Sequence, residues 1–177
     1  ELLAATRRGG RIAYRLAEEP QALIAELEAG RPVLVLQNLL TPHVPVWHYA
    51  VLTGFDARSN RFFLNSGTKQ QLPINARKFL RSWDWAERWA MVALRPGEIP
   101  ARADPHRYAE AVTAFEIVAS SEATRTAWQA AAERWPQEPL AYLALGNLAY
   151  GAADLQHAID FYRRGLKANP RNPALLN

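Results

Sequence analysis

The chain of 177 residues contains no cysteine, so it forms no disulfide and offers no thiol of its own. It has no apolar run of the roughly 18 residues that would span a bilayer, and no signal peptide is recognisable. Its net charge is only +4, and its 21 Lys and Arg residues are scattered along the chain. Nucleic-acid binding, which needs clustered basic residues, is therefore disfavoured.

Metal and cofactor binding also find no support in the sequence. Of the four histidines, His43, His106 and His157 share no ligand spacing with His48, so we expect no metal site and no cofactor. His157 falls in a predicted helix, where we expect it at the surface.

The composition changes near residue 100, and the change divides the chain into two predicted domains. Residues 1–96 mix helix and strand signals. Residues 97–104 form a linker within the run "RPGEIPARADP", which carries three prolines and a glycine, and residues 105–177 are helical and rich in alanine. The predicted fold class is α+β: an antiparallel sheet with helices, followed by an all-α repeat domain.

The first domain should contain both kinds of element in mixed order. The predicted helices are 1–8, 20–29 and 76–89, and the predicted strands are 11–16, 31–38, 47–55, 61–65 and 90–96. The run "RPVLVLQN" is apolar nearly throughout, which predicts a strand buried on both faces. The turn formers of "DARSN" predict a hairpin between the third and fourth strands.

The second domain repeats with a period of about 34 residues, the tetratricopeptide period. The pattern is met at Tyr142, Leu145, Gly146, Ala158, Tyr162 and Pro170, and a weaker copy has Tyr108, Phe115, Trp128 and Pro136. Small residues let paired helices approach, aromatic side chains fill the groove beside them, and proline ends the second helix. We predict tetratricopeptide repeats at 105–138 and 139–172 and the start of a third, with an ordinary helical bundle as the alternative. Such repeats bind peptides or proteins in a groove.

One titratable residue, His48, interrupts the apolar strand "WHYAVLTGF". A histidine in a strand is more often a core residue, whose ring nitrogens then need hydrogen-bond partners. If the hairpin brings Asn65 level with His48, the amide oxygen can accept the ring N–H and fix the tautomer. That is the orienting role in nucleophile–base–orienter catalysis. Asp56 is an alternative orienter, but its place suits a turn former.

Residues 30–67 resemble the C-terminal half of a papain-like cysteine peptidase of the bacteriocin-processing, double-glycine leader type. "GRPVLV" at 30–35 matches one family element and "HYAVLTG" at 48–54 the next. Asn65 stands where the family has Asp, 17 residues after His48, and Ser66 replaces the proline that follows. The resemblance covers roughly residues 1–95.

The resemblance implies a peptidase with His48 as general base and Asn65 as its orienter, acting with a Gln and a Cys that lie upstream. Trp47 is the predicted substrate-binding residue, whereas core packing is the more frequent role for Trp83 and Trp85. The substrate would be a peptide or protein, and a partner protein would occupy the repeat groove. The family also implies a periplasmic or cell-envelope location.

The missing nucleophile leaves two explanations. The chain begins at Glu1 rather than Met, so we expect that a Cys-bearing segment is absent from it, could act as its partner, and is needed for activity. The alternative is an inactive pseudo-peptidase that serves as an interaction scaffold. Neither Ser66 nor Thr53 lies in a G-x-S-x-G elbow, which disfavours a serine hydrolase. A transglutaminase or acyltransferase on the same fold stays open.

Overall fold

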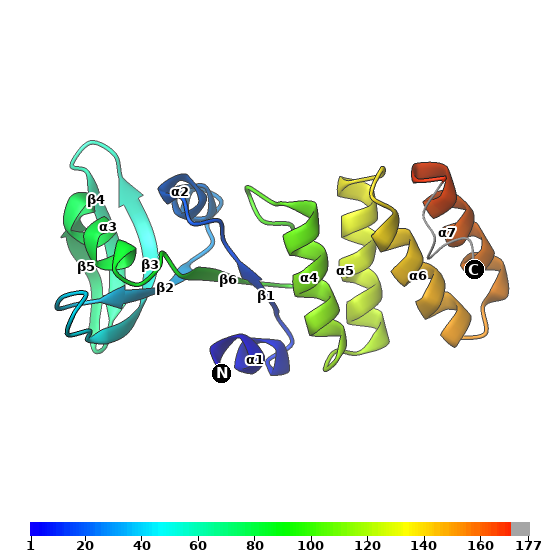
Figure 1. Cartoon of the computed structure of the whole chain (residues 1–177), viewed down its shortest axis with the longest axis horizontal. Coiled ribbons are helices and arrows are strands. Elements are labelled where there is room, and N and C mark those ends of the chain that lie inside the picture. Colours follow the sequence, from blue (N-terminus) through cyan, green and yellow to red (C-terminus); the bar gives the residue numbers. More distant parts are fainter. Residues whose placement is uncertain (171–177) are drawn as a thin grey trace. The chain divides into compact units, whose positions relative to one another are not determined.

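The computed structural model describes residues 1–170 and contains one six-stranded sheet and seven helices (Figure 1). The helices are α1 (Leu2–Arg8), α2 (Pro20–Glu28), α3 (Ala76–Asp84), α4 (Pro105–Glu116), α5 (Ser121–Arg134), α6 (Pro139–Gly151) and α7 (Leu155–Ala168). The strands are β1 (Ile12–Arg15), β2 (Val33–Asn38), β3 (Trp47–Asp56), β4 (Arg61–Ser66), β5 (Lys69–Asn75) and β6 (Ala90–Leu94). The predicted mixture of a sheet with helices and a helical C-terminal region is confirmed.

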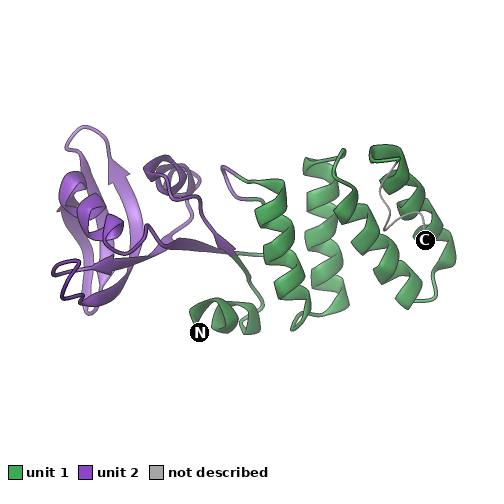
Figure 2. Ribbon diagram, in the orientation of Figure 1, with its two compact units in different colours: residues 1–13, 94–99, 103–177 green, residues 14–93, 100–102 purple. Residues whose placement is uncertain are grey.

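The described chain divides into two compact units (Figure 2). Residues 14–93 and 100–102 form one, called here the sheet unit, and the remaining described residues form the other, called the helical unit. The sheet unit thus takes in three residues of the predicted linker. Among residues 1–170, no helix has both the length and the apolar character needed to cross a membrane.

The sheet has the strand order β1-β6-β2-β3-β4-β5, and β2 pairs antiparallel with both β3 and β6. The predicted hairpin joins β3 to β4. In its turn, the Asp56 carboxylate accepts hydrogen bonds from the Arg58 N–H at 2.9 Å and the Ser59 hydroxyl at 2.6 Å. These bonds hold the pKa of Asp56 below its ordinary value. Asp56 is therefore occupied as a turn former.

The core of the sheet unit lies between one sheet face and α3. Val35, Leu52 and Leu64 of the central strands are buried on that face. From α3, Phe79 packs on Phe62 with ring centroids 4.7 Å apart, and Trp83 stacks on Phe79. On the opposite face of β2, Leu34 and Leu36 are only partly buried and Asn38 at the strand end is buried, so the prediction of burial on both faces is wrong for the middle of this strand. Antiparallel strands commonly bury one face more deeply than the other.

Two elements differ from the sequence prediction. The last strand in the sheet order, β5, was not predicted, because "KQQLPIN" contains Pro73 and few strand formers. Proline is tolerated there because an edge strand needs fewer backbone donors. Helix α3 ends at Asp84 rather than at 89, since Glu87 and Arg88 adopt left-handed φ values of 53° and 52°. That turn brings the carbonyl of Trp89 back towards the helix.

In the helical unit, α6 begins 34 residues after α4, and α7 begins 34 residues after α5. Where α6 packs against α7, a Cβ built on Gly146 would overlap the Tyr162 ring. The small residue and the aromatic residue therefore meet as the repeat pattern requires. The assignment of these helices to the tetratricopeptide type stays a prediction, and the predicted start of a third repeat lies outside the described residues.

Candidate functional site

The candidate site is built around His48, which lies half-buried near the start of β3. Its cross-strand neighbour on β2 is Gln37, and residues paired in this way share a sheet face. The other side of β3 pairs with β4, where the Nε2 atom of His48 lies 2.7 Å from the hydroxyl oxygen of Ser66. Within residues 1–170 the Nδ1 atom of His48 makes no hydrogen bond. One ring nitrogen is thus held and the other is open.

The predicted hydrogen bond between Asn65 and His48 is absent, and this part of the prediction is wrong. Asn65 pairs with Val51, which is three residues from His48 and therefore points to the opposite face. There the Asn65 Oδ1 atom accepts the backbone N–H of Gln71 at 3.0 Å. Successive strand residues alternate between faces. The register of β4 against β3 therefore places Ser66, rather than Asn65, beside the imidazole.

Trp47 also lies on the face opposite His48, because it is the adjacent residue of the same strand. Its side chain is 56% exposed, so it is available to a ligand, although not on the side of the imidazole. The substrate-binding role of Trp47 therefore stays a prediction. Of the two tryptophans for which core packing was expected, Trp83 is fully buried and Trp85 is half-buried.

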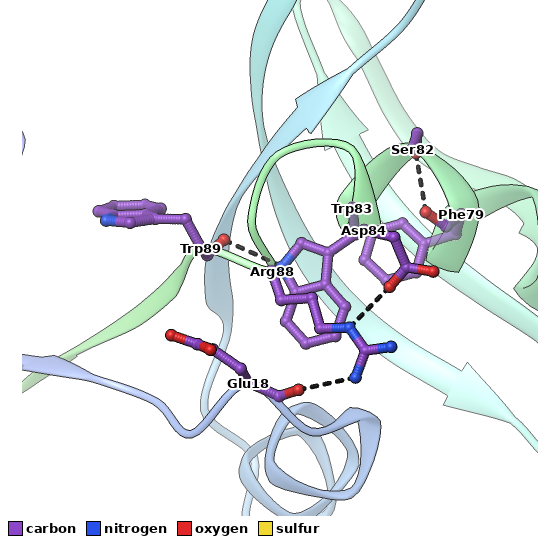
Figure 3. A network of polar contacts seen from close by, with 7 residues as sticks. All are labelled: Glu18, Phe79, Ser82, Trp83, Asp84, Arg88 and Trp89. Atoms are coloured by element: carbon purple, nitrogen blue, oxygen red, sulfur yellow. Dashed lines mark hydrogen bonds and ion pairs between the residues drawn. The ribbon is translucent and has the colours of Figure 1, made fainter. Parts of the chain in front are cut away.

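Sequence reasoning missed two polar residues, Gln37 on the His48 face of the sheet and Ser82 on α3. Gln37 is buried, and its Nε2 donates to the Ser82 hydroxyl on α3 at 2.7 Å. That hydroxyl in turn donates to the Phe79 carbonyl at 2.8 Å, a bond drawn in Figure 3. Gln37 is a polar residue near the end of an apolar strand, but only the strand register shows that it shares a face with His48.

A small pocket of about 100 Å³ opens at the Gln37 end of this face. It lies between α3 and the residues that follow β2, with Lys78, Arg81 and Trp85 on the helix side. The Arg81 guanidinium sits 5.3 Å from the centre of the Trp85 ring. The pocket therefore combines positive charge with apolar surface.

The structure groups no metal-binding residues at the site. Among the described residues there is no cluster of three or more His, Asp or Glu side chains that could hold a metal ion. His157 is exposed and pairs with Asp154 at the start of α7, with Nδ1 and Oδ2 2.7 Å apart, so its predicted surface position is confirmed. What the arrangement around His48 can do is accept and return a proton at Nδ1 while Nε2 is held.

Comparisons with known proteins give little for this chain. No family model matches it, and no curated protein matches it. One solved structure is similar: a protein from Bacillus anthracis that is provisionally described as a C39-like peptidase. The two are 17% identical with a TM-score of 0.44, and the match covers 53% of this chain and 56% of that one. The similar region is thus about half of each chain, and a likeness at this level assigns neither family nor activity.

Proposed function

We propose that the sheet unit is the histidine-bearing half of a cysteine peptidase domain and that the helical unit binds protein. The observation that carries the proposal is the half-buried His48, with Nε2 held by Ser66 and Nδ1 open. An imidazole buried only to fill space would need a partner at each nitrogen. An imidazole held at one nitrogen and open at the other suits a general base.

In the proposed reaction, Nδ1 of His48 takes the proton from a cysteine thiol supplied by a segment outside this chain. The thiolate attacks the peptide carbonyl, and the amine leaves with the proton from Nδ1. Water then hydrolyses the thioester with His48 again acting as base, which regenerates the thiol. This chain by itself contains no nucleophilic thiol, so we expect the isolated chain to be inactive.

The test is a peptidase assay on the product of the complete gene with fluorogenic peptides. We expect activity that iodoacetamide abolishes and that His48→Ala lowers by about 10²- to 10⁴-fold, the usual contribution of a general base. His43→Ala is a matched control, because that histidine is exposed in the β2–β3 loop and has no hydrogen-bond partner among the described residues. A His48→Ala variant with wild-type rates would refute the role of His48.

A non-enzymatic scaffold is the second candidate, and one feature of the helical unit favours it. A groove of about 400 Å³ opens among α5, α6 and α7, with Tyr142 and Phe161 beside Glu133 and Arg164. Mixed aromatic and charged linings of this kind suit peptide segments. If the complete gene product binds peptides by calorimetry but cleaves none, the scaffold is the better description.

A further inference from the structure

The partner of the His48 ring lies where β4 ends in a tight turn. Ser66 is the last residue of β4 and pairs with Lys69, the first residue of β5. The two residues between them include Gly67, which has a left-handed φ of 58°, as two-residue hairpin turns require. The turn places the Ser66 hydroxyl on the His48 face, 2.7 Å from Nε2.

The other polar residues that could orient the ring are committed elsewhere. Gln37 donates to Ser82, Asn65 accepts from Gln71, and Thr53 donates to the Phe63 carbonyl at 3.2 Å. Within residues 1–170, no side chain other than Ser66 hydrogen-bonds to the imidazole. The role expected of Asn65 is therefore open to Ser66.

We propose that Ser66 is the positioning residue of His48: its hydroxyl oxygen accepts the Nε2–H, which leaves the lone pair on Nδ1 and fixes the ring plane. The catalytic consequence rests on the proposed peptidase function, whereas the hydrogen bond itself does not. A hydroxyl is neutral, so it orients the ring without the ion pairing that a carboxylate would add to the imidazolium. Asn65 contributes indirectly, because its bond to Gln71 braces the turn that carries Ser66.

The hydrogen bond can be tested on this chain by NMR of the ¹⁵N-labelled imidazole at a pH where His48 is neutral. We expect the proton on Nε2, visible as an N–H signal whose exchange with water is slowed by the bond. Ser66→Ala should abolish that signal, and Ser66→Thr, which keeps a hydroxyl, should retain it. Asn65→Asp is the matched control: it keeps an acceptor for Gln71 and should leave the signal unchanged.

Three results would overturn the assignment. A wild-type ring protonated on Nδ1 would do so without any variant, which covers the case in which Ser66→Ala fails to fold. A protected Nε2–H that survives in folded Ser66→Ala would also do so. Loss of the signal in folded Asn65→Asp would return the role to Asn65.

A kinetic arm on the complete gene product separates this proposal from the proposed function. Ser66→Ala should lower kcat about tenfold with KM unchanged, the effect of losing one neutral hydrogen bond, and Ser66→Thr should restore most of it. If the gene product cleaves no peptide but the NMR result holds, the peptidase proposal fails and the positioning of His48 stands. If His48→Ala abolishes activity while Ser66→Ala leaves kcat unchanged, the peptidase proposal stands and the positioning role fails.

Discussion

The sheet unit and the helical unit each bury one tryptophan almost completely, and the two side chains differ in one bond. Trp83 in α3 donates its indole N–H to the Trp89 carbonyl at 3.0 Å, as drawn in Figure 3. Trp128 in α5 is 2% exposed, and its indole nitrogen has no hydrogen-bond partner among the described residues. The comparison indicates that polar bonds fix the tryptophan of the sheet unit, whereas packing shape fixes that of the helical unit.

The bonds around Trp83 come from the turn that follows α3. Arg88, in a left-handed conformation, places its guanidinium 5.9 Å from the centre of the Trp83 ring. The same side chain bonds to the Asp84 carboxylate at 2.7 Å and to the Glu18 carbonyl at 3.0 Å (Figure 3). The helical unit relies instead on close helix contacts, of which Gly146 against Tyr162 is the clearest.

The largest expected effect is that of Trp83→Ala in the sheet unit. Removing a fully buried indole leaves a cavity under the sheet and should lower the free energy of unfolding by about 3–5 kcal/mol, measured by urea denaturation. Trp85→Ala is the control, because Trp85 is half-buried at the pocket rim, and it should cost less than half as much. Equal costs would mean that the core of the sheet unit is not centred on Trp83.

The next effect tests close packing in the helical unit through Gly146→Val. The new side chain would overlap the Tyr162 ring, which is also held by a 2.9 Å bond from its hydroxyl to Asn147. We expect a loss of about 1–3 kcal/mol in urea denaturation, typical of overpacking. Gly151→Ala, in the same helix with open space around its Cβ, should be neutral or stabilising by up to about 1 kcal/mol. A neutral Gly146→Val would show that α6 and α7 do not depend on this contact.

A third effect concerns the stability of the helical unit at alkaline pH. Burial, and then the charge of Glu98, raise the pKa of Tyr108 above its ordinary value of 10.0. The phenol therefore ionises more readily when the chain unfolds. The contribution of the buried neutral phenol to the free energy of unfolding is complete below about pH 10. Above that pH it falls by about 1.4 kcal/mol per pH unit until the pH reaches the pKa of Tyr108 in the folded chain.

Tyr108→Phe should remove this part of the alkaline loss, as measured by urea denaturation between pH 9 and pH 11.5. The variant also gives up the bond from the Tyr108 hydroxyl to the Glu98 carbonyl, so it should be less stable at neutral pH and lose less stability above pH 10. Tyr150→Phe, at a side chain that is 65% exposed, should behave as the wild type throughout. An unchanged pH slope in Tyr108→Phe would contradict the assignment.

Features that depend on residues close together in the chain could be predicted from the sequence, whereas features that depend on distant residues could not. The helices from α4 to α7 were predictable because their spacing and small residues act within neighbouring stretches of chain. His48 could be singled out as a candidate site residue because it is an imidazole within an apolar strand. Its partner was not, because the register of β3 and β4 depends on an irregularity between Leu52 and Gly54 and on the turn after Ser66. The alternating pattern from which strands are predicted does not locate such features, because a bulge shifts one strand by a residue against its partner.

The smallest effect returns to the two tryptophans and separates their N–H groups from their bulk. Trp83→Phe and Trp128→Phe both leave a void of similar size, but only Trp83→Phe gives up a hydrogen bond. The Trp89 carbonyl still accepts the Leu36 N–H at 3.1 Å, so the added cost is that of one bond, about 1 kcal/mol. Trp128→Phe instead removes a buried donor that has no partner, and this gain offsets part of the stability lost through the void.

Urea denaturation should therefore show that Trp83→Phe is at least about 1 kcal/mol more destabilising than Trp128→Phe. Trp83→Ala and Trp128→Ala serve as the reference for the two Phe variants, because each removes the whole ring together with its N–H group. If the Phe variants are equally stable, or if Trp128→Phe costs more, the indole of Trp128 has a hydrogen-bond partner in solution. In that case both cores are fixed by polar bonds, and the contrast between the two units disappears.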